Sequence, residues 1–129
     1  MLPLRFGKLW LALGWMLAAL IVILSLWPKP PELLDFEQSD KLAHIIAYSI
    51  LMLWFANIYP QSSSRLQLGI GFFAMGVCLE FLQGMTEYRQ FSYVDMLANG
   101  FGIILAIYLA KTRLATCLLH LDTWLERSA

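Results

Sequence analysis

Charge is scarce in this sequence. Of its 129 residues, 14% are charged and 60% are hydrophobic, and nine basic residues balance nine acidic ones. An ordinary soluble domain of this length is excluded, because it would need more polar residues to cover its core. The zero net charge provides no basic field, so no nucleic-acid partner is expected. The length suits a single domain covering residues 1–129.

Cysteine is also scarce, with two residues in the chain. Cys78 lies within an apolar run and Cys117 lies beyond the end of another, which places them at different predicted membrane depths. A disulfide requires Cα atoms within about 7 Å of each other. We therefore expect no disulfide and interpret both cysteines as small packing residues.

In place of charge, the sequence has four long apolar runs. A helix needs about 20 apolar residues to cross ~30 Å of hydrocarbon. The runs cover residues 9–27, 41–59, 66–83 and 93–110. Pro28 ends the first, Pro60 ends the second before the polar connection 61–65, and Gly84 ends the third. The short connections predict an all-α integral membrane protein with four transmembrane helices in an antiparallel bundle.

The first run is expected to be a retained anchor, because it is too long for the core of a signal peptide and lacks small residues at its end. The segment after the fourth run is amphipathic, with Leu114, Leu118, Leu121 and Leu125 at helical spacing and Asp122 elsewhere around the helix. This pattern predicts a C-terminal amphipathic helix on the cytoplasmic membrane surface, or a frayed extension of the fourth span.

Basic residues are unevenly distributed between the two sets of connections. With the N-terminus in the cytoplasm, the inner segments contain Arg5, Lys8, Arg65, Lys111, Arg113 and Arg127. The outer segments then contain Lys29, Lys41 and Arg89 among Glu32, Asp35, Glu37, Asp40 and Glu87. Because cytoplasmic loops carry excess Lys and Arg, we predict a multi-pass protein with both termini in the cytoplasm.

Polar residues gather at one end of three predicted helices. An ionisable side chain inside a membrane costs ~2.5–3.5 kcal/mol on insertion scales and therefore indicates function. With this topology, the polar ends of the second, third and fourth runs all reach the outer leaflet. The candidate ligand-binding residues are Asp40, Lys41, His44, Tyr48, Glu80, Gln83, Arg89, Ser92, Asp95 and Asn99.

Deeper along the same helical faces, the residues are small: Gly76, Gly102 and Ala106. Small residues allow helix backbones to approach closely, so we expect the polar faces to oppose one another. A purely structural interpretation is also open for Asp95 and Asn99, which can hydrogen-bond helices together. Ser92 is similarly a good N-cap residue for the fourth helix.

Three of these residues are candidates for chemistry. His44 beside Asp40 or Glu80 would be an oriented general base, so the catalytic candidates are His44, Glu80 and Asp95. A metal site is not predicted, because the group has a single histidine and no zinc-ligand spacing. Because an unpaired carboxylate within the membrane is costly, we expect a direct charge-assisted contact from Glu80 to Lys41, His44 or Arg89.

Three motifs occur in order along residues 39–103: Ser39-Asp40-Lys41-Leu42-Ala43-His44 with Tyr48, then Glu80-Phe81-Leu82-Gln83, then Arg89-Gln90-Phe91-Ser92-Tyr93-Val94-Asp95 with Asn99, Gly100 and Gly102. In this combination the chain resembles the VanZ-like family of small bacterial membrane proteins. The resemblance implies a few transmembrane helices in the bacterial inner membrane. The family's namesake is associated with teicoplanin resistance, which suggests a link to envelope-antibiotic susceptibility. The resemblance names no reaction.

Three functions fit this arrangement. The first is a non-catalytic envelope protein that binds a lipid head group or a lipid-linked envelope precursor in the outer leaflet, with Lys41 and Arg89 contacting phosphate. The second is a membrane-embedded enzyme acting on a lipidic substrate with His44 as base, although no serine or cysteine lies in a recognisable nucleophile elbow. The third is a structural subunit of a membrane complex. No cofactor is expected for any of them.

Overall fold

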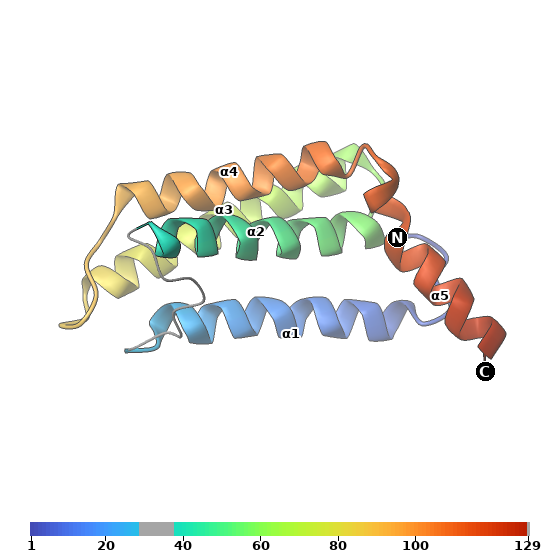
Figure 1. Ribbon diagram of the computed structural model, residues 1–129, viewed down its shortest axis with the longest axis horizontal. Helices are drawn as coiled ribbons and strands as arrows, with labels where there is room; N and C mark the ends of the chain where they lie inside the picture. The colour runs from blue at the N-terminus through green and yellow to red at the C-terminus, as the bar shows by residue number, and fades with distance from the viewer. Residues whose placement is uncertain (29–37, 129) are drawn as a thin grey trace.

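The computed structural model describes residues 1–28 and 38–128. Within these ranges the chain forms helices and no strands: α1 (Gly7–Leu26), α2 (Ser39–Ile58), α3 (Ser62–Gly84), α4 (Tyr93–Leu109), the 3₁₀ helix η1 (Arg113–Thr116) and α5 (Cys117–Ser128). The first four helices lie side by side along the long axis, and α5 leans away at the end where the N-terminus lies (Figure 1). The predicted all-α class is confirmed.

Three helices, α1, α2 and α3, are individually long and apolar enough to cross a membrane. Helix α4 has 17 residues, and it qualifies only together with Arg113–Ser128, from which it is bent by 80°. At 1.5 Å per residue, α4 is ~26 Å long, slightly less than the hydrocarbon thickness. The chain therefore has the helices of a multi-pass, all-α membrane protein.

The helices begin and end close to the predicted runs, with one correction at the start of α3. That helix begins at Ser62 and not at residue 66. The reason lies in Arg65, whose guanidinium donates hydrogen bonds to the carbonyls of Ala56 (2.8 Å), Tyr59 (3.0 Å) and Ala110 (3.2 Å). The polar side chain is thereby satisfied while the backbone stays helical. The predicted outer-loop residues Lys29, Glu32, Asp35 and Glu37 lie outside the described residues.

The central helix of the bundle is α2, which packs against α1, α3 and α4. Its Leu51, Met52 and Phe55 have no exposed surface. Close packing of this kind is the main source of helix association in a membrane, where apolar burial alone provides no driving force. The position of α2 therefore decides which faces of the other three helices meet.

The closest backbone approach joins α2 to α4. A Cβ atom added at Gly102 would lie 2.5 Å from the carbonyl oxygen of Ile45. The hydroxyl of Ser49 donates a hydrogen bond to the carbonyl of Gly102 (3.0 Å). Together with Gly76 and Ala106, Gly102 is buried, which confirms that the small-residue faces lie inside the bundle.

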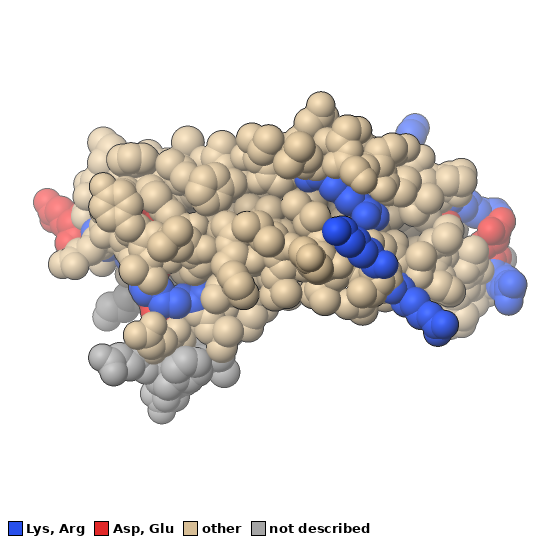
Figure 2. Space-filling model, turned by 90° about the horizontal axis from the view of Figure 1, so that it is seen from above, with Lys and Arg blue, Asp and Glu red and all other residues tan. Residues whose placement is uncertain are grey.

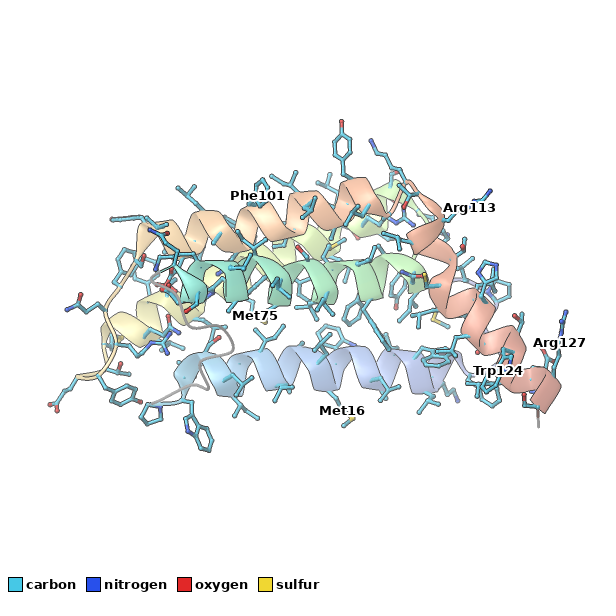
Figure 3. The ribbon with its side chains drawn as sticks, viewed as in Figure 1. Met16, Met75, Phe101, Arg113, Trp124 and Arg127 are labelled. Atoms are coloured by element: carbon cyan, nitrogen blue, oxygen red, sulfur yellow. The ribbon has the colours of Figure 1, made fainter. Side chains whose placement is uncertain are left out.

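Large apolar side chains cover the outside of the helices. Exposed examples on α1, α3 and α4 are Met16, Ile23, Ile70, Phe73, Phe101 and Ile104, and Met16 and Phe101 point away from the bundle in Figure 3. On the face in Figure 2, charged side chains gather at the two ends, and a row of basic side chains extends from one end toward the middle of an otherwise uncharged surface. So extensive an apolar surface suits contact with lipid and not with water.

The two cysteines do not pack inside the bundle. Both Cys78 and Cys117 are free thiols, as expected from their separation, but both are exposed. The prediction that they are packing residues is therefore wrong. Gly76 and Leu79 take the inward positions on that part of α3 and are buried, so the outward face of the helix is left for Cys78.

Helix α5 is attached to the start of α1 through a buried carboxylate. Asp122 is 2% exposed. It accepts hydrogen bonds from the backbone N–H of Arg5 (2.8 Å) and Phe6 (3.0 Å) and from the indole N–H of Trp10 (2.7 Å). Burial alone would raise the pKa of Asp122, but these hydrogen bonds hold that pKa below its ordinary value.

The C-terminal segment forms a helix of its own, α5, and Arg113–Ser128 is bent by 80° from α4. The bend favours a separate amphipathic helix over a frayed extension of the fourth span. Leu121 and Trp124 are exposed on α5, as expected of an amphipathic helix. Asp122, however, contacts α1, because the unpaired N–H groups at the start of that helix need an acceptor.

Gly102→Ala should lower the free energy of unfolding by about 1–3 kcal/mol, because the new methyl group meets the backbone of α2 and not a movable side chain. Gly71→Ala is the matched control, since no atom lies within 4 Å of a Cβ added there. Unfolding by SDS titration in detergent micelles measures both. Equal effects of the two substitutions would contradict the close approach of α2 and α4.

Candidate functional site

His44 projects from α2 toward α4 and is held there by an amide. Its Nδ1 lies 2.9 Å from Oδ1 of Asn99. Because an amide oxygen only accepts hydrogen bonds, Nδ1 is the donor in this contact. Nε2 faces Asp95, with 3.7 Å between Nε2 and Oδ2. The imidazole is thus oriented by α4 with its other nitrogen directed at a carboxylate.

Lys41 lies between two carboxylates at the start of α2. Its ammonium is 2.5 Å from Oδ2 of Asp40 and 2.6 Å from Oδ1 of Asp95. The Asp95 side chain is 8% exposed, and its buried Oδ1 has no partner in hydrogen-bond geometry. The contact with Lys41 is therefore ionic, and it compensates the charge of this buried carboxylate.

Glu80, on α3, is 1% exposed and accepts a hydrogen bond from the backbone N–H of Ser92 (3.0 Å). Ser92 is the N-cap of α4, and its hydroxyl accepts from the N–H of Asp95 (3.3 Å), as its interpretation as a cap predicted. Glu80 therefore supplies an acceptor to the end of a helix whose first N–H groups have no intrahelical partner.

The predicted contact of Glu80 with a basic side chain is present as proximity to His44, within 4.8 Å, and not as a hydrogen bond or ion pair. Within residues 1–28 and 38–128, no hydrogen bond or ion pair joins Glu80 to Lys41, His44 or Arg89. The backbone N–H of Ser92 takes the place of the expected cation. Glu80 nevertheless faces the bundle interior and lies close to His44.

Three other candidate residues are Tyr48, Arg89 and Gln83. The first two lie around Glu80, whereas Gln83 points toward α1. Tyr48 is 2% exposed, and its hydroxyl would be 3.1 Å from a Cβ added at Gly76, one turn before Glu80. Arg89, half-buried, lies in the connection between α3 and α4. Gln83 donates to the carbonyl of Ser25 on α1 (2.5 Å), because that carbonyl is in the last turn of its helix and needs a donor.

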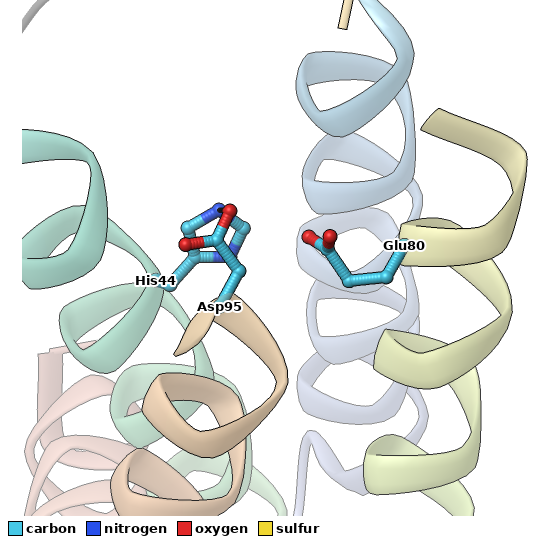
Figure 4. Close-up of side chains that lie close together, drawn as sticks. All are labelled: His44, Glu80 and Asp95. Atoms are coloured by element: carbon cyan, nitrogen blue, oxygen red, sulfur yellow. Dashed lines mark ion pairs between the residues drawn. The ribbon is translucent and has the colours of Figure 1, made fainter. Parts of the chain in front are cut away.

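The structure brings the three catalytic candidates together at one end of the bundle. One ring nitrogen of His44 and one oxygen each of Glu80 and Asp95 lie within 4.8 Å of one another. Figure 4 shows Glu80 pointing from α3 toward His44 and Asp95, which come from α2 and α4. We call these three side chains the His44 cluster. The close packing of three helices therefore brings together three side chains that are far apart in the sequence and follow no metal-ligand spacing.

The charges around the His44 cluster do not balance. Three carboxylates, those of Asp40, Glu80 and Asp95, accompany the two basic side chains of Lys41 and Arg89. Leaving His44 out, the formal charges of these five side chains sum to −1. Such a group in a low-dielectric setting attracts a proton or a cation. The arrangement can orient a base, bind a cation or present a basic side chain to an anion.

Buried polar residues at the opposite end were not predicted as a group. Asn57 donates to the carbonyl of Leu53 (2.8 Å) and accepts from the N–H of Leu118 (3.2 Å). Together with Arg65 and Asp122, it bonds mainly to backbone groups. A lone amide in an apolar run was the available signal, but its partner lies on α5, 61 residues away. The contacts at this end are structural.

Comparison with known proteins identified no match for this chain. Scans of protein-family models, curated proteins and solved structures each found no match. What the His44 cluster can do therefore follows from its geometry.

Glu80 variants test its role at the start of α4. Glu80→Leu should lower the free energy of unfolding by about 1–3 kcal/mol, because the Ser92 N–H loses its acceptor. Glu80→Gln keeps an acceptor oxygen and should fold nearly as stably. Glu80→Lys should impair folding, since it adds a positive charge to a confined site. SDS titration measures all three.

Glu87→Leu is the control for this series, because Glu87 is an exposed acidic residue in the connection between α3 and α4. It should leave stability nearly unchanged. If Glu80→Gln were as destabilising as Glu80→Leu, the negative charge of Glu80, and not its hydrogen bond, would be what the fold requires.

Proposed function

We propose that the chain is a four-span protein of a bacterial plasma membrane, with α1 to α4 as the spans and both termini in the cytoplasm. The orientation is supported by the basic residues near the α5 end, since cytoplasmic segments carry excess Lys and Arg. The N-terminus and α5 share that end (Figure 1). The exposed Leu121 and Trp124 of α5 then rest at the cytoplasmic interface.

We further propose that the opposite, polar end binds the head group of a lipid or of a lipid-linked envelope precursor in the outer leaflet. The observation that carries this proposal is the convergence of His44, Glu80 and Asp95 from three helices at one end of an otherwise apolar bundle. Polar groups at this depth are reached by a head group whose acyl chains lie along the exposed apolar helix faces.

The contacts within the site indicate different roles for its two basic residues, Lys41 and Arg89. Lys41 is engaged by Asp40 and Asp95, as expected if carboxylates position it. Arg89 has no ion-pair partner among residues 1–28 and 38–128, so it is the better candidate for a lipid phosphate, which guanidinium groups bind with paired hydrogen bonds. Gln83 and Asn99 are occupied by Ser25 and His44 and are not assigned to the ligand.

The resemblance to the VanZ-like family supports the same location for the site. Its motifs contain Lys41, His44, Glu80, Arg89 and Asp95, all from the polar end of the bundle. Membership of that family, and with it a role in susceptibility to envelope-directed antibiotics, is part of the proposal.

A second candidate function is an enzyme acting on the bound lipid. It is favoured by one observation, the orientation of the His44 ring, whose Nδ1 bonds to Asn99 while Nε2 faces Asp95. A base oriented in this way could remove a proton from a substrate hydroxyl or from water. In that case, Asp95 would stabilise the imidazolium that forms.

Reporter fusions test the orientation. Fusions after Ser128 and insertions within residues 61–65 should report a cytoplasmic location, and insertions beside Glu32 or Arg89 should report the exterior, because the Lys and Arg bias sets topology. An external C-terminus would place the His44 cluster at the cytoplasmic face and contradict an outer-leaflet site.

Lipid binding is tested by mass spectrometry of lipids that co-purify with the protein. Arg89→Gln should reduce a bound phospholipid or lipid-linked species at least several-fold, whereas Arg113→Gln, an exposed position at the other end, should not. His44→Gln should leave binding intact if the site only binds. If His44 is a base, the same variant should accumulate unconverted lipid. If the wild-type protein carried no more lipid than a sample of the detergent alone, this result would contradict the proposed function.

A further inference from the structure

The His44 cluster has the dimensions of a metal site. Metal–ligand bonds to imidazole nitrogen and carboxylate oxygen are about 2.0–2.2 Å long, so two ligand atoms on one ion lie roughly 3–4.4 Å apart. Nε2 of His44 and Oδ2 of Asp95 are 3.7 Å apart, and all three ligand atoms fall within 4.8 Å of one another. Small side-chain movements are sufficient to bring one ion into contact with all three.

The surroundings of each group prepare it to be a ligand. A ligating histidine usually donates its second N–H to a carbonyl or carboxylate, which fixes the ring. Asn99 accepts that hydrogen bond from His44 (2.9 Å). Glu80 is oriented in the same way, because Ser92 N–H binds Oε2 and leaves Oε1 available. The partners of the ligands are therefore in place as well as the ligands.

Asp95 has a second oxygen that can turn to an ion. Its side chain is 8% exposed, and Oδ1 is paired with the ammonium of Lys41 at 2.6 Å. Oδ2 lies 3.7 Å from Nε2 of His44 and makes no hydrogen bond within the described residues. An ion bound between Oδ2 and Nε2 would have its charge partly compensated by the carboxylates of Asp95 and Glu80.

We propose that His44, Glu80 and Asp95 bind one divalent metal ion, of the class to which Zn²⁺ and Mn²⁺ belong. One imidazole with two carboxylates is a donor set that suits these divalent first-row metal ions better than Ca²⁺, which prefers oxygen ligands alone. Three protein ligands leave coordination positions open, as in catalytic zinc sites. The identity of the group in those positions, a lipid phosphate oxygen, rests on the proposed function, but the ion itself does not.

Lys41 adds a means of control, because its ammonium lies 2.6 Å from Oδ1 of Asp95 and competes with the ion for that carboxylate. Removing this ammonium should strengthen metal binding. A merely structural Lys41–Asp95 pair would give no such gain. The sign of the effect therefore separates a metal site from an ion pair that only holds α2 to α4.

The experiment uses the full chain purified in an uncharged detergent, stripped of metal with a chelator and of lipid by extended washing. Cys78→Ser and Cys117→Ser form the background, because exposed thiols bind zinc. Zn²⁺ is titrated by calorimetry and Mn²⁺ by electron paramagnetic resonance. We expect saturable binding of one ion per chain. An absence of saturable binding of either ion would overturn the proposal.

Variants then locate the ion. His44→Ala should weaken binding at least ~100-fold, and Asn99→Ala ~10–100-fold through the lost orientation of the ring. His120→Ala is the matched control, since His120 is exposed on α5 and bonds to the carbonyl of Thr116. Equal losses with His44→Ala and His120→Ala would overturn the assignment. Lys41→Met should raise affinity, and lower affinity would contradict an ion at Asp95.

These measurements contain no lipid, so their outcome is separate from that of the lipid analysis. Metal binding without a co-purifying lipid would leave this inference standing and remove the proposed ligand. A co-purifying lipid without metal binding would overturn this inference and leave the proposed lipid-binding function standing.

Discussion

The close approach of α2 and α4 is the constraint on which the polar end of the molecule depends. Gly102 allows the backbone of α4 to lie against the carbonyl of Ile45, and this contact fixes both the distance and the register of the two helices. His44 immediately precedes Ile45, while Asn99 lies about one turn and Asp95 about two turns before Gly102. The imidazole therefore meets the amide and the carboxylate together. A side chain at position 102 would separate these groups as well as the helices.

The two ends of the bundle use buried polar groups differently. At the α5 end, Arg65 and Asp122 bond to several backbone groups each, so the capacity of these side chains is consumed in joining helix ends. At the other end, the polar side chains face one another: Oδ1 of Asp95 is paired with the ammonium of Lys41 (2.6 Å), and Oδ2 faces Nε2 of His44 at 3.7 Å without a hydrogen bond. That contrast distinguishes the structural end from the candidate site.

The sequence predicted the helices and the gathering of polar residues at one end of three of them, because apolar run length and helical periodicity determine both. It also predicted that Gly102 faces another helix. It did not predict that Glu80 binds the N–H of Ser92 or that Gln83 reaches α1. Sequence patterns show which residues are charged and which share a helix face. These partners, however, are backbone groups, and whether a backbone group lacks an intrahelical partner depends on where its helix begins or ends. The same limit applies to Asp122, since an amphipathic pattern does not tell a solvent-facing carboxylate from a docked one.

The bond between Asp122 and the first turn of α1 has a consequence for biosynthesis. The indole of Trp10 and its acceptor are 112 residues apart in the chain, so α1 enters the membrane with the N–H groups of Arg5 and Phe6 still without this partner. Its first turn is completed only after almost the whole chain has left the ribosome. Until then the other contacts of α1 are those that it makes with α2 and α3. The N-terminal end of α1 therefore reaches its final contacts only after α5 has been made.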